Sequence, residues 1–184
     1  MRLLPLISLL LLTGVALAQD DSVTFHQTST WATAGIGRGF MPGSGSLAGK
    51  IALSYQQGAH LYTVRVFSVS EFAIGVEHNL PSPDQWLVDY AVMYGRAWHR
   101  PTAYWSVSAG LGFVRGARRG ALLNPLNLLD HESIGITTLG IAFDAHMFAV
   151  PVPHIGIGIA ASSNLNPQKS FAGIMVCLHI GDID

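Results

Sequence analysis

Apolar residues alternate with small or polar residues along most of the chain beyond residue 30. Successive side chains of a β-strand point to opposite faces, so a repeat of two predicts strands. The clearest alternation covers residues 103–113, where one face carries Ala103, Trp105, Val107, Ala109, Leu111 and Phe113. Segments 47–55, 137–147, 153–161 and 174–181 repeat it, and 30–38, 60–70 and 87–97 show it less clearly. The pattern predicts eight strands of about ten residues, the length of a tilted strand that crosses a bilayer.

The links between these predicted strands alternate between longer and shorter segments. In chain order they are 39–46, 56–59, 71–86, 98–102, 114–133, 149–152 and 162–169. Transmembrane barrels show this asymmetry, because their periplasmic turns are tight and their external loops are long. If both termini lie at the short-link end, the first, third, fifth and seventh links lie outside the cell.

The first 18 residues have the pattern of a secretory signal peptide. Arg2 precedes an apolar run over residues 3–15, and Ala16-Leu17-Ala18 supplies small residues for cleavage. We predict that residues 1–18 are removed and that residues 19–184 form one domain. An uncleaved anchor is the alternative, although the run is short for a membrane span.

Composition narrows the functional classes. Hydrophobic residues make up 49% of the chain and charged residues 11%, with a mean hydropathy of +0.38. Because charged residues usually make up about a quarter of a soluble domain, this balance argues against disorder, nucleic-acid binding and a typical cytosolic enzyme. The single cysteine, Cys177, excludes an internal disulfide framework.

The signal-like segment, the eight alternating strands and the alternating link lengths together resemble the small eight-stranded outer-membrane barrels typified by the OmpA membrane domain and OmpX. The resemblance implies an all-β fold, a single eight-stranded antiparallel up-and-down transmembrane barrel. It also implies export to the outer membrane and, as partners, outer-membrane lipid, lipopolysaccharide and the barrel assembly machinery, with a monomeric state. One departure is the end of the chain, Gly181-Asp182-Ile183-Asp184, where such barrels often carry an aromatic residue.

If the apolar face meets lipid, the opposite face points into the barrel. That face carries four charged residues, Lys50, Arg65, Asp89 and Asp144. An eight-stranded barrel is only wide enough to be filled by side chains, and buried charges must be paired. We therefore predict that these four residues form an interior polar network in a barrel without a wide pore. A narrow gated conduit is the alternative.

Three histidines, His146, His154 and His179, share the inward face and suggest a metal site. Their spacing matches no metal motif, so we interpret them as interior or rim histidines and expect no metal and no cofactor. Cys177 lies on the same face without a basic neighbour, and we interpret it as a small apolar filler.

The link at 114–133 contains Arg115, Arg118 and Arg119. Guanidinium groups at the outer rim can pair with lipopolysaccharide phosphates, although a solvated basic loop is an equal alternative. Aromatic residues at headgroup depth form girdles in such barrels. The girdle candidates are Trp31, Tyr55, Tyr62, Tyr90, Tyr94, Trp98 and Trp105.

Catalysis has one weak signal in the sequence. Residues 162–166, Ser-Ser-Asn-Leu-Asn, resemble the His-x-Ser-Asn element of PagL-type lipid A deacylases, but Ala161 stands where the general base would be. We interpret this segment as a turn and predict a structural, surface-contact or adhesive barrel without catalytic residues. The alternatives are a lipid-modifying barrel enzyme and a soluble periplasmic lipocalin-like barrel, whose apolar face would point inward.

Overall fold

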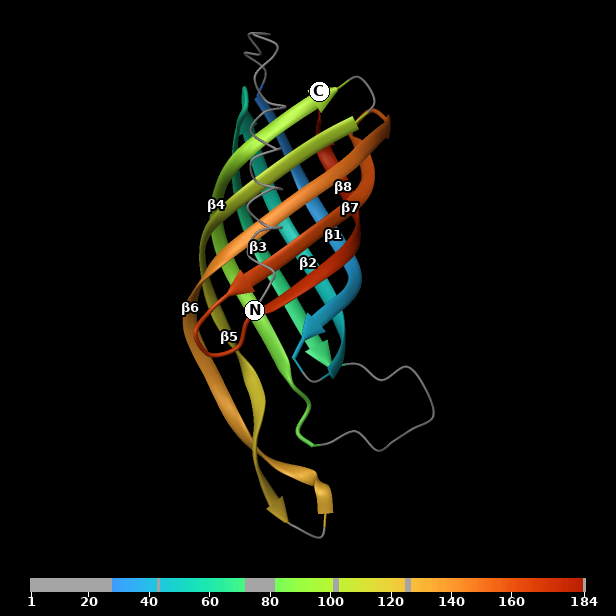
Figure 1. Ribbon diagram of the computed structural model, residues 1–184. Coiled ribbons are helices and arrows are strands. Elements are labelled where there is room, and N and C mark those ends of the chain that lie inside the picture. Colours follow the sequence, from blue (N-terminus) through green and yellow to red (C-terminus); the bar gives the residue numbers. More distant parts are fainter. Residues whose placement is uncertain (1–27, 43, 72–81, 101–102, 125–126, 184) are drawn as a thin grey trace, which may run out of the picture.

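Eight antiparallel strands form a closed barrel, because β1 pairs with β2 along one edge and with β8 along the other. The computed structural model describes residues 28–42, 44–71, 82–100, 103–124 and 127–183, shown as a tilted ring of strands in Figure 1. The strands are β1 (Thr28–Met41), β2 (Ser44–Gln57), β3 (His60–Glu71), β4 (Trp86–Arg100), β5 (Ala103–Asn124), β6 (Asn127–Val152), β7 (Ile155–Leu165) and β8 (Phe171–Asp182). Each strand pairs with its sequence neighbours, so the predicted eight-stranded up-and-down barrel is confirmed.

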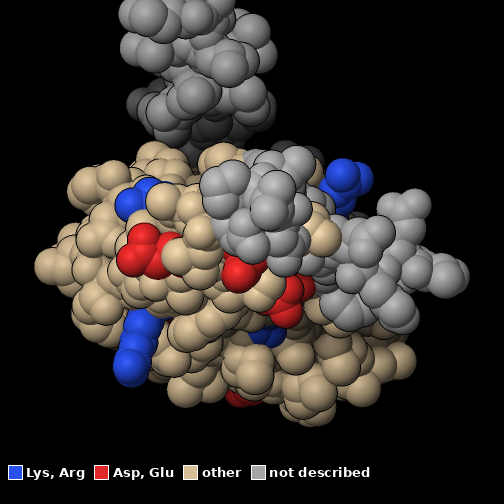
Figure 2. Space-filling model, turned by 90° about the horizontal axis from the view of Figure 1, so that it is seen from below, with Lys and Arg blue, Asp and Glu red and all other residues tan. Residues whose placement is uncertain are grey.

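The apolar face of the strands forms the outside of the barrel. Leu111 is 75% exposed and Ile51 69%, whereas Lys50 is 3% and Asp89 0% exposed. Seen along the barrel from the end of the β5–β6 hairpin, the surface consists mostly of uncharged residues (Figure 2). A lipocalin-like barrel would have the opposite arrangement, so the soluble alternative does not fit this structure.

Aromatic side chains form a patch on the outer surface toward the end of the barrel where the chain begins. Tyr55, Tyr62 and Tyr94 are cross-strand neighbours on β2, β3 and β4, and all three are exposed. Trp98 and Trp105 form the next such pair, on β4 and β5. Tyr90 on β4 is also exposed, nearer the other end. Trp31 departs from the prediction because it is only 2% exposed and points into the barrel.

Two of the longer links predicted to be loops are largely strands in the structure, and the short link predicted at 149–152 lies within β6. β5 and β6 continue to Asn124 and Asn127, and together they project beyond the barrel as a two-stranded hairpin (Figure 1). The prediction of a loop over 114–133 is therefore wrong, because the backbone groups of the two strands bond to each other. Likewise β1 continues to Met41 and β2 starts at Ser44, inside the link predicted at 39–46.

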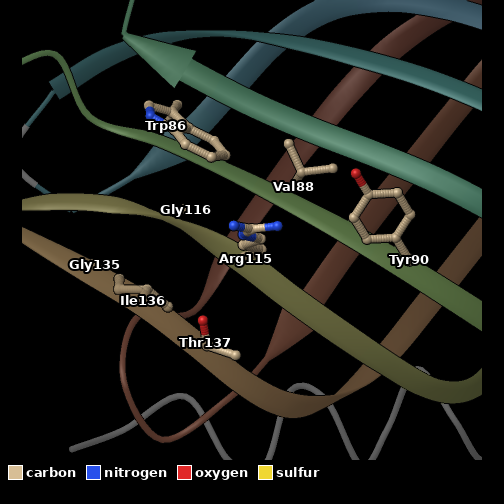
Figure 3. A pocket seen from close by; sticks show the side chains of 8 residues that line it. All are labelled: Trp86, Val88, Tyr90, Arg115, Gly116, Gly135, Ile136 and Thr137. Carbon is tan, nitrogen blue, oxygen red and sulfur yellow. The ribbon is translucent and has the colours of Figure 1, made fainter.

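The three arginines of the predicted loop therefore lie on β5. Arg115 is within the barrel wall, between β4 and β6 (Figure 3). Pairing of β4 with β5 ends at Ala117, so Arg118 and Arg119 lie at the base of the projecting hairpin. All three belong to a paired strand rather than to a flexible segment.

The link between β3 and β4 contacts this hairpin at its described end. The Ser82 amide donates to the Leu129 carbonyl at 2.6 Å, and the His131 amide donates to the Ser82 carbonyl at 2.9 Å. The residues described in this link are 82–85. The predicted signal peptide, residues 1–18, lies outside the described residues.

Among the residues that the structure describes, no helix combines the length and the hydrophobicity needed to cross a membrane.

Candidate functional site

Four charged side chains from four strands meet inside the barrel. Lys50 of β2 donates to Asp144 of β6 at 2.5 Å. Arg65 of β3 pairs with Asp89 of β4, and its Nη1 lies 3.3 Å from Asp144 Oδ1. Their side chains are 0 to 1% exposed. The structure thus brings together all four residues that the alternation placed on the inward face.

Three further polar residues complete this interior network. Ser162 of β7 donates to Asp144 Oδ1 at 2.5 Å, and Asn164 donates to Asp89 Oδ1 at 3.0 Å. His146 Nε2 lies 2.6 Å from Lys50 Nζ and 3.1 Å from Asp144 Oδ2. The sequence analysis missed Ser162 and Asn164 as interior residues. The alternation of β7 would have found them. Ser162 and Asn164 lie two and four positions after the inward-facing Ala160, so they share its face of the strand.

Glycines in β5 and β6 make room for this network. A Cβ atom at Gly112 would overlap Asp89 Oδ1 and would come within 2.6 Å of Asn164 Nδ2. A Cβ atom at Gly140 would overlap Asn164 Oδ1. The small residues on the inward face are therefore part of the site, because they leave the volume that the long charged side chains occupy.

The charges of the network balance, with two cations facing two carboxylates. Removing a charge from water costs several kcal/mol, and only close pairing and further hydrogen bonds offset that cost. Arg65 also donates to the main-chain carbonyl of Phe143 at 2.9 Å and to that of Ser163 at 3.2 Å. The network therefore connects the side chains of β2, β3, β4, β6 and β7.

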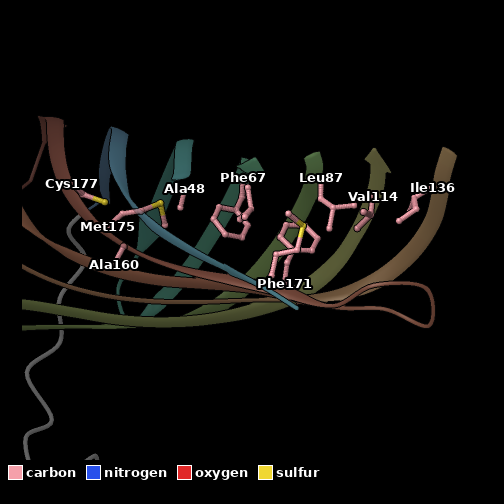
Figure 4. Packing of buried hydrophobic residues seen from close by; sticks show 11 residues of the cluster. Ala48, Phe67, Leu87, Val114, Ile136, Ala160, Phe171, Met175 and Cys177 are labelled. Atoms are coloured by element: carbon pink, nitrogen blue, oxygen red, sulfur yellow. The ribbon is translucent and has the colours of Figure 1, made fainter. Parts of the chain in front are cut away.

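Apolar side chains lie on both sides of the charged layer. Toward the hairpin end, Phe67 stacks on Phe171 with ring centroids 5.4 Å apart, within a cluster that also contains Leu87, Val114 and Ile136 (Figure 4). Toward the end where the chain begins, a second cluster consists of Trp31, Leu61, Ala97, Tyr104, Phe148 and Ile183. The described part of the interior is thus filled in three layers, two apolar and one charged.

The histidines are divided between the interior and a turn. The rings of His146 and His179 lie 5.5 Å apart, and His179 Nδ1 is 2.9 Å from the Thr33 hydroxyl. His154, predicted to point inward, is exposed in the turn between β6 and β7, where its φ is 68°. The alternation of inward and outward positions stops at this turn, so it could not predict the direction of the His154 side chain. Among the described residues no group of three or more His, Cys, Asp or Glu side chains could hold a metal ion.

Four of the five residues that resembled a deacylase motif, 162–165, belong to strand β7, and only Asn166 lies in the link that follows it. Ser162 and Asn164 point into the barrel, and the Ser162 hydroxyl donates to Asp144 rather than to a histidine. A serine nucleophile needs a base that accepts its proton and a path for substrate. Here a serine, an acid and a histidine converge in the filled interior, not at the outer rim where a lipid substrate would arrive.

A second polar cluster, which we call the rim cluster, lies at the hairpin end and consists of Glu71, Gln85, Arg119 and Lys169. Arg119 reaches both carboxylate oxygens of Glu71, and Gln85 donates to Glu71 through its amide at 3.0 Å and its side chain at 2.9 Å. Lys169 donates to the Gln85 side chain. Burial alone would raise the pKa of Glu71, but the hydrogen bonds from Gln85 and Arg119 outweigh it and lower that pKa.

The rim cluster joins the hairpin to two other links between strands. Glu71 ends β3, Gln85 precedes β4, and Lys169 lies between β7 and β8. Burial lowers the pKa of Lys169, and the neighbouring Arg119 and Arg118 lower it further, against the opposing effect of Glu71. Arg119 is thus committed to Glu71, whereas Arg115 and Arg118 are exposed on the surface.

Comparison with solved structures identifies the fold. The chain superposes on Neisserial surface protein A (NspA) with a TM-score of 0.57 at 10% identity, covering 83% of this chain and 96% of NspA. Ail, the attachment invasion locus protein of Yersinia pestis, gives 0.55 at 11% identity, covering 84% and 97%. The N-terminal β-barrel domain of Pseudomonas aeruginosa OprF gives 0.53 at 9% identity, covering 84% and 100%. This chain has the fold of the eight-stranded outer-membrane barrels. No protein-family model and no curated protein matches its sequence.

Proposed function

We propose that this chain is a small integral outer-membrane barrel with a structural, surface-contact or adhesive role, without catalysis and without a wide pore. The observation that carries the proposal is the inverted distribution of polarity. Leu111, Ile51 and Leu139 on the outside are 69 to 75% exposed, while the charged network is buried. Contact between this large apolar surface and water would be unfavourable, whereas contact with the hydrocarbon chains of a membrane would be favourable.

The surface-contact role rests on the β5–β6 hairpin. It projects beyond the barrel as a paired unit, and the rim cluster joins its base to β3 and β4 (Figure 1). A hairpin held in this way presents side chains to a partner at low entropic cost. Arg118 is an exposed cation at its base, and one structure of Ail contains the heparin analogue sucrose octasulfate. Anionic surface molecules are therefore the contact chemistry that we propose.

Location and partners follow from the same proposal. Residues 1–18 direct export and are removed, and the barrel assembly machinery inserts the remaining chain as a monomer. Outer-membrane lipid surrounds the apolar wall, and lipopolysaccharide lies at the hairpin end. The hairpin faces outward because β1 begins and β8 ends at the opposite end of the barrel, which is the periplasmic end in barrels of this kind.

Membrane extraction tests the barrel part of the proposal. After carbonate washing, the protein should remain in the outer-membrane fraction, and unheated and boiled samples should migrate differently on a denaturing gel. A mature chain that is monomeric and soluble without detergent would contradict the proposal. Lipid A from cells with and without the protein should carry the same acyl chains, and a lost or gained chain would show catalysis.

A shortened hairpin tests the contact part. Replacing residues 118–134 by Asn-Gly removes the exposed Arg118 together with the hairpin and joins the paired positions Ala117 and Gly135 through a two-residue turn. Cells that make the full chain should bind heparin-coated beads, and cells that make the shortened chain should bind several-fold less. The shortened protein should keep its heat-dependent migration, which shows that the barrel still folds. Equal binding by the two cell types, or binding no better than that of cells without the protein, would contradict the adhesive role.

A further inference from the structure

A groove of about 410 Å³ lies on the barrel wall across β4, β5 and β6, near the base of the hairpin. Trp86 and Tyr90 line it from β4, Arg115 from β5, and Gly135 and Thr137 from β6 (Figure 3). It is separate from the charged network, which lies on the inward face of the wall. Its lining combines two aromatic rings, one cation and the hydroxyls of Tyr90 and Thr137.

The strand register places these residues in three successive rows across the wall. The middle row is Val88, Arg115 and Thr137, and the row toward the hairpin is Trp86, Ala117 and Gly135. Directly opposite side chains in such rows lie about 5 Å apart. Because Ala117 and Gly135 are small, the surface beside Trp86 is hollow in the row that lies next to Arg115 on the hairpin side.

The rows toward the middle of the barrel carry no charge and are apolar apart from the Tyr90 hydroxyl. Tyr90, Phe113 and Leu139 form the first of them, and Val92, Leu111 and Ile141 form the second. Leu111 and Val92 are 75% and 69% exposed, as expected for side chains in contact with acyl chains. Arg115 therefore lies at the boundary between the apolar belt and the hairpin, where the headgroups of the outer leaflet would lie.

Within the described part of the chain, Arg115 has no partner, unlike Arg119. Arg119 is bound to Glu71, whereas among the described residues the Arg115 side chain forms no hydrogen bond and no ion pair. A guanidinium offers a planar set of donors that matches a phosphate, and such pairs are strong where water is partly excluded. The groove thus joins an unpaired cation to an apolar wall, which is complementary to an anionic amphiphile.

We propose that this groove binds one molecule of lipid A, the phosphorylated and acylated disaccharide of lipopolysaccharide, with a phosphate on Arg115. The acyl chains lie along the Tyr90, Phe113 and Leu139 row, and a sugar fills the hollow above Ala117 and Gly135, within reach of the Thr137 hydroxyl. This inference rests on the proposed outer-membrane location, since only there does the groove meet this lipid.

Native mass spectrometry of the detergent-solubilised protein tests the site. The probes are lipid A, lipid A without its phosphates, phosphatidylethanolamine and inorganic phosphate, each added separately. Lipid A should be retained on the protein and the other three should not. Arg115→Gln should lower the retention of lipid A about tenfold, the loss expected for one charge-assisted contact. The matched control is Arg96→Gln, an exposed arginine on the outer face toward the other end of the barrel.

A second variant tests the shape of the groove without changing its charge. A Cβ atom added at Gly135 meets no atom within 4 Å, so a side chain can start there, and Gly135→Leu places its apolar atoms in the hollow. This variant should keep its heat-dependent migration and should lose retention of lipid A to a similar extent as Arg115→Gln. Loss of heat-dependent migration would show misfolding, and Arg115→Gln alone then decides the outcome.

Three results would overturn the lipid site. They are equal retention of lipid A by Arg115→Gln and the wild type, equal retention of phosphorylated and dephosphorylated lipid A, and an equal loss in Arg96→Gln. Retention of phosphatidylethanolamine at the level of lipid A would show a general lipid surface and would also contradict it. These results leave the proposed membrane location intact, because carbonate extraction tests that location separately.

Discussion

Arg65 holds two carboxylates inside the barrel, and its side chain has no exposed surface. It contacts Asp89 and Asp144 while also donating to main-chain carbonyls of β6 and β7. Replacing a buried ion pair as a whole can be neutral, but removing one partner leaves an uncompensated charge. At the residue scale, the fold therefore depends on complete pairing more than on any single charge.

Arg65→Met should lower the free energy of unfolding by roughly 3–5 kcal/mol, because it leaves Asp89 and Asp144 with one cation between them. Urea unfolding of the protein in detergent micelles measures this change. Arg96→Met, at an exposed position on the outer face, should stay within about 0.5 kcal/mol of the wild type. A loss for Arg65→Met no larger than that for Arg96→Met would mean that the network adds nothing to stability.

The alternation alone could place Lys50, Arg65, Asp89 and Asp144 inside the barrel. Each lies at an inward position of an alternating segment, although the pattern is weaker in the segments of Arg65 and Asp89. It could not place Trp31, since Gly35, Gly37 and Gly39 share its inward face and hide the pattern. The alternation also could not predict which charged residues pair with each other. That depends on the register of strands that are distant in sequence, as for Lys50 and Asp144, which are 94 residues apart.

At the scale of elements, the β5–β6 hairpin is the part that the sequence predicted least well. Its strand pairing shifts register between Arg119 and Leu122 and again before Asn124, so the alternation breaks there. Leu122 and Leu123 are consecutive apolar residues, a pattern that fits neither face of a regular strand. These register shifts interrupt the alternation, and the sequence pattern therefore predicted a loop where the structure has a paired hairpin.

The rim cluster should release this hairpin in acid. The folded pKa of Glu71 is lowered, so its stabilising contribution is full above the unfolded value of about 4.3 and is lost as the pH falls through the folded pKa. A spin label can be attached to the hairpin in the double variant Leu123→Cys, Cys177→Ala, in which the native thiol is absent. The label should become more mobile as the pH falls below the folded pKa of Glu71. Glu71→Gln should give the mobile spectrum already at neutral pH.

Glu132→Gln is the control for this experiment, because Glu132 lies on the same hairpin and is exposed. It should leave the label as ordered as in the wild type at neutral pH. If the label in Glu71→Gln is as ordered at neutral pH as it is in the wild type, the rim cluster does not hold the hairpin.

At the scale of the whole molecule, three layers of side chains fill the interior. The apolar cluster around Phe67 and Phe171 lies at the hairpin end, the charged network lies in the middle, and the cluster around Trp31 and Tyr104 closes the other end. Ions would have to cross two layers of closely packed, mainly apolar side chains, in one of which the Tyr104 hydroxyl already donates to Gln56. A filled barrel of eight strands therefore should not conduct.

In planar bilayers the purified protein should show no steady conductance above the bare membrane. The heat-dependent gel shift of the same sample verifies that the barrel is folded. A reproducible large channel would contradict the filled interior, and brief small openings would support the narrow gated conduit.

The charged layer also bears on how the barrel is assembled. Lys50 lies on β2 and Asp144 on β6, four strands apart in the ring of eight, so these partners meet only when the sheet has curved through about half of its circumference. A half-formed sheet in the bilayer would leave Lys50 and Asp144 without each other, at a cost of several kcal/mol each, whereas Arg65 could already pair with Asp89 on the adjacent β4. Intermediates are thereby disfavoured relative to the closed ring. Burying the charges in the middle of the wall thus makes insertion and ring closure a single cooperative event.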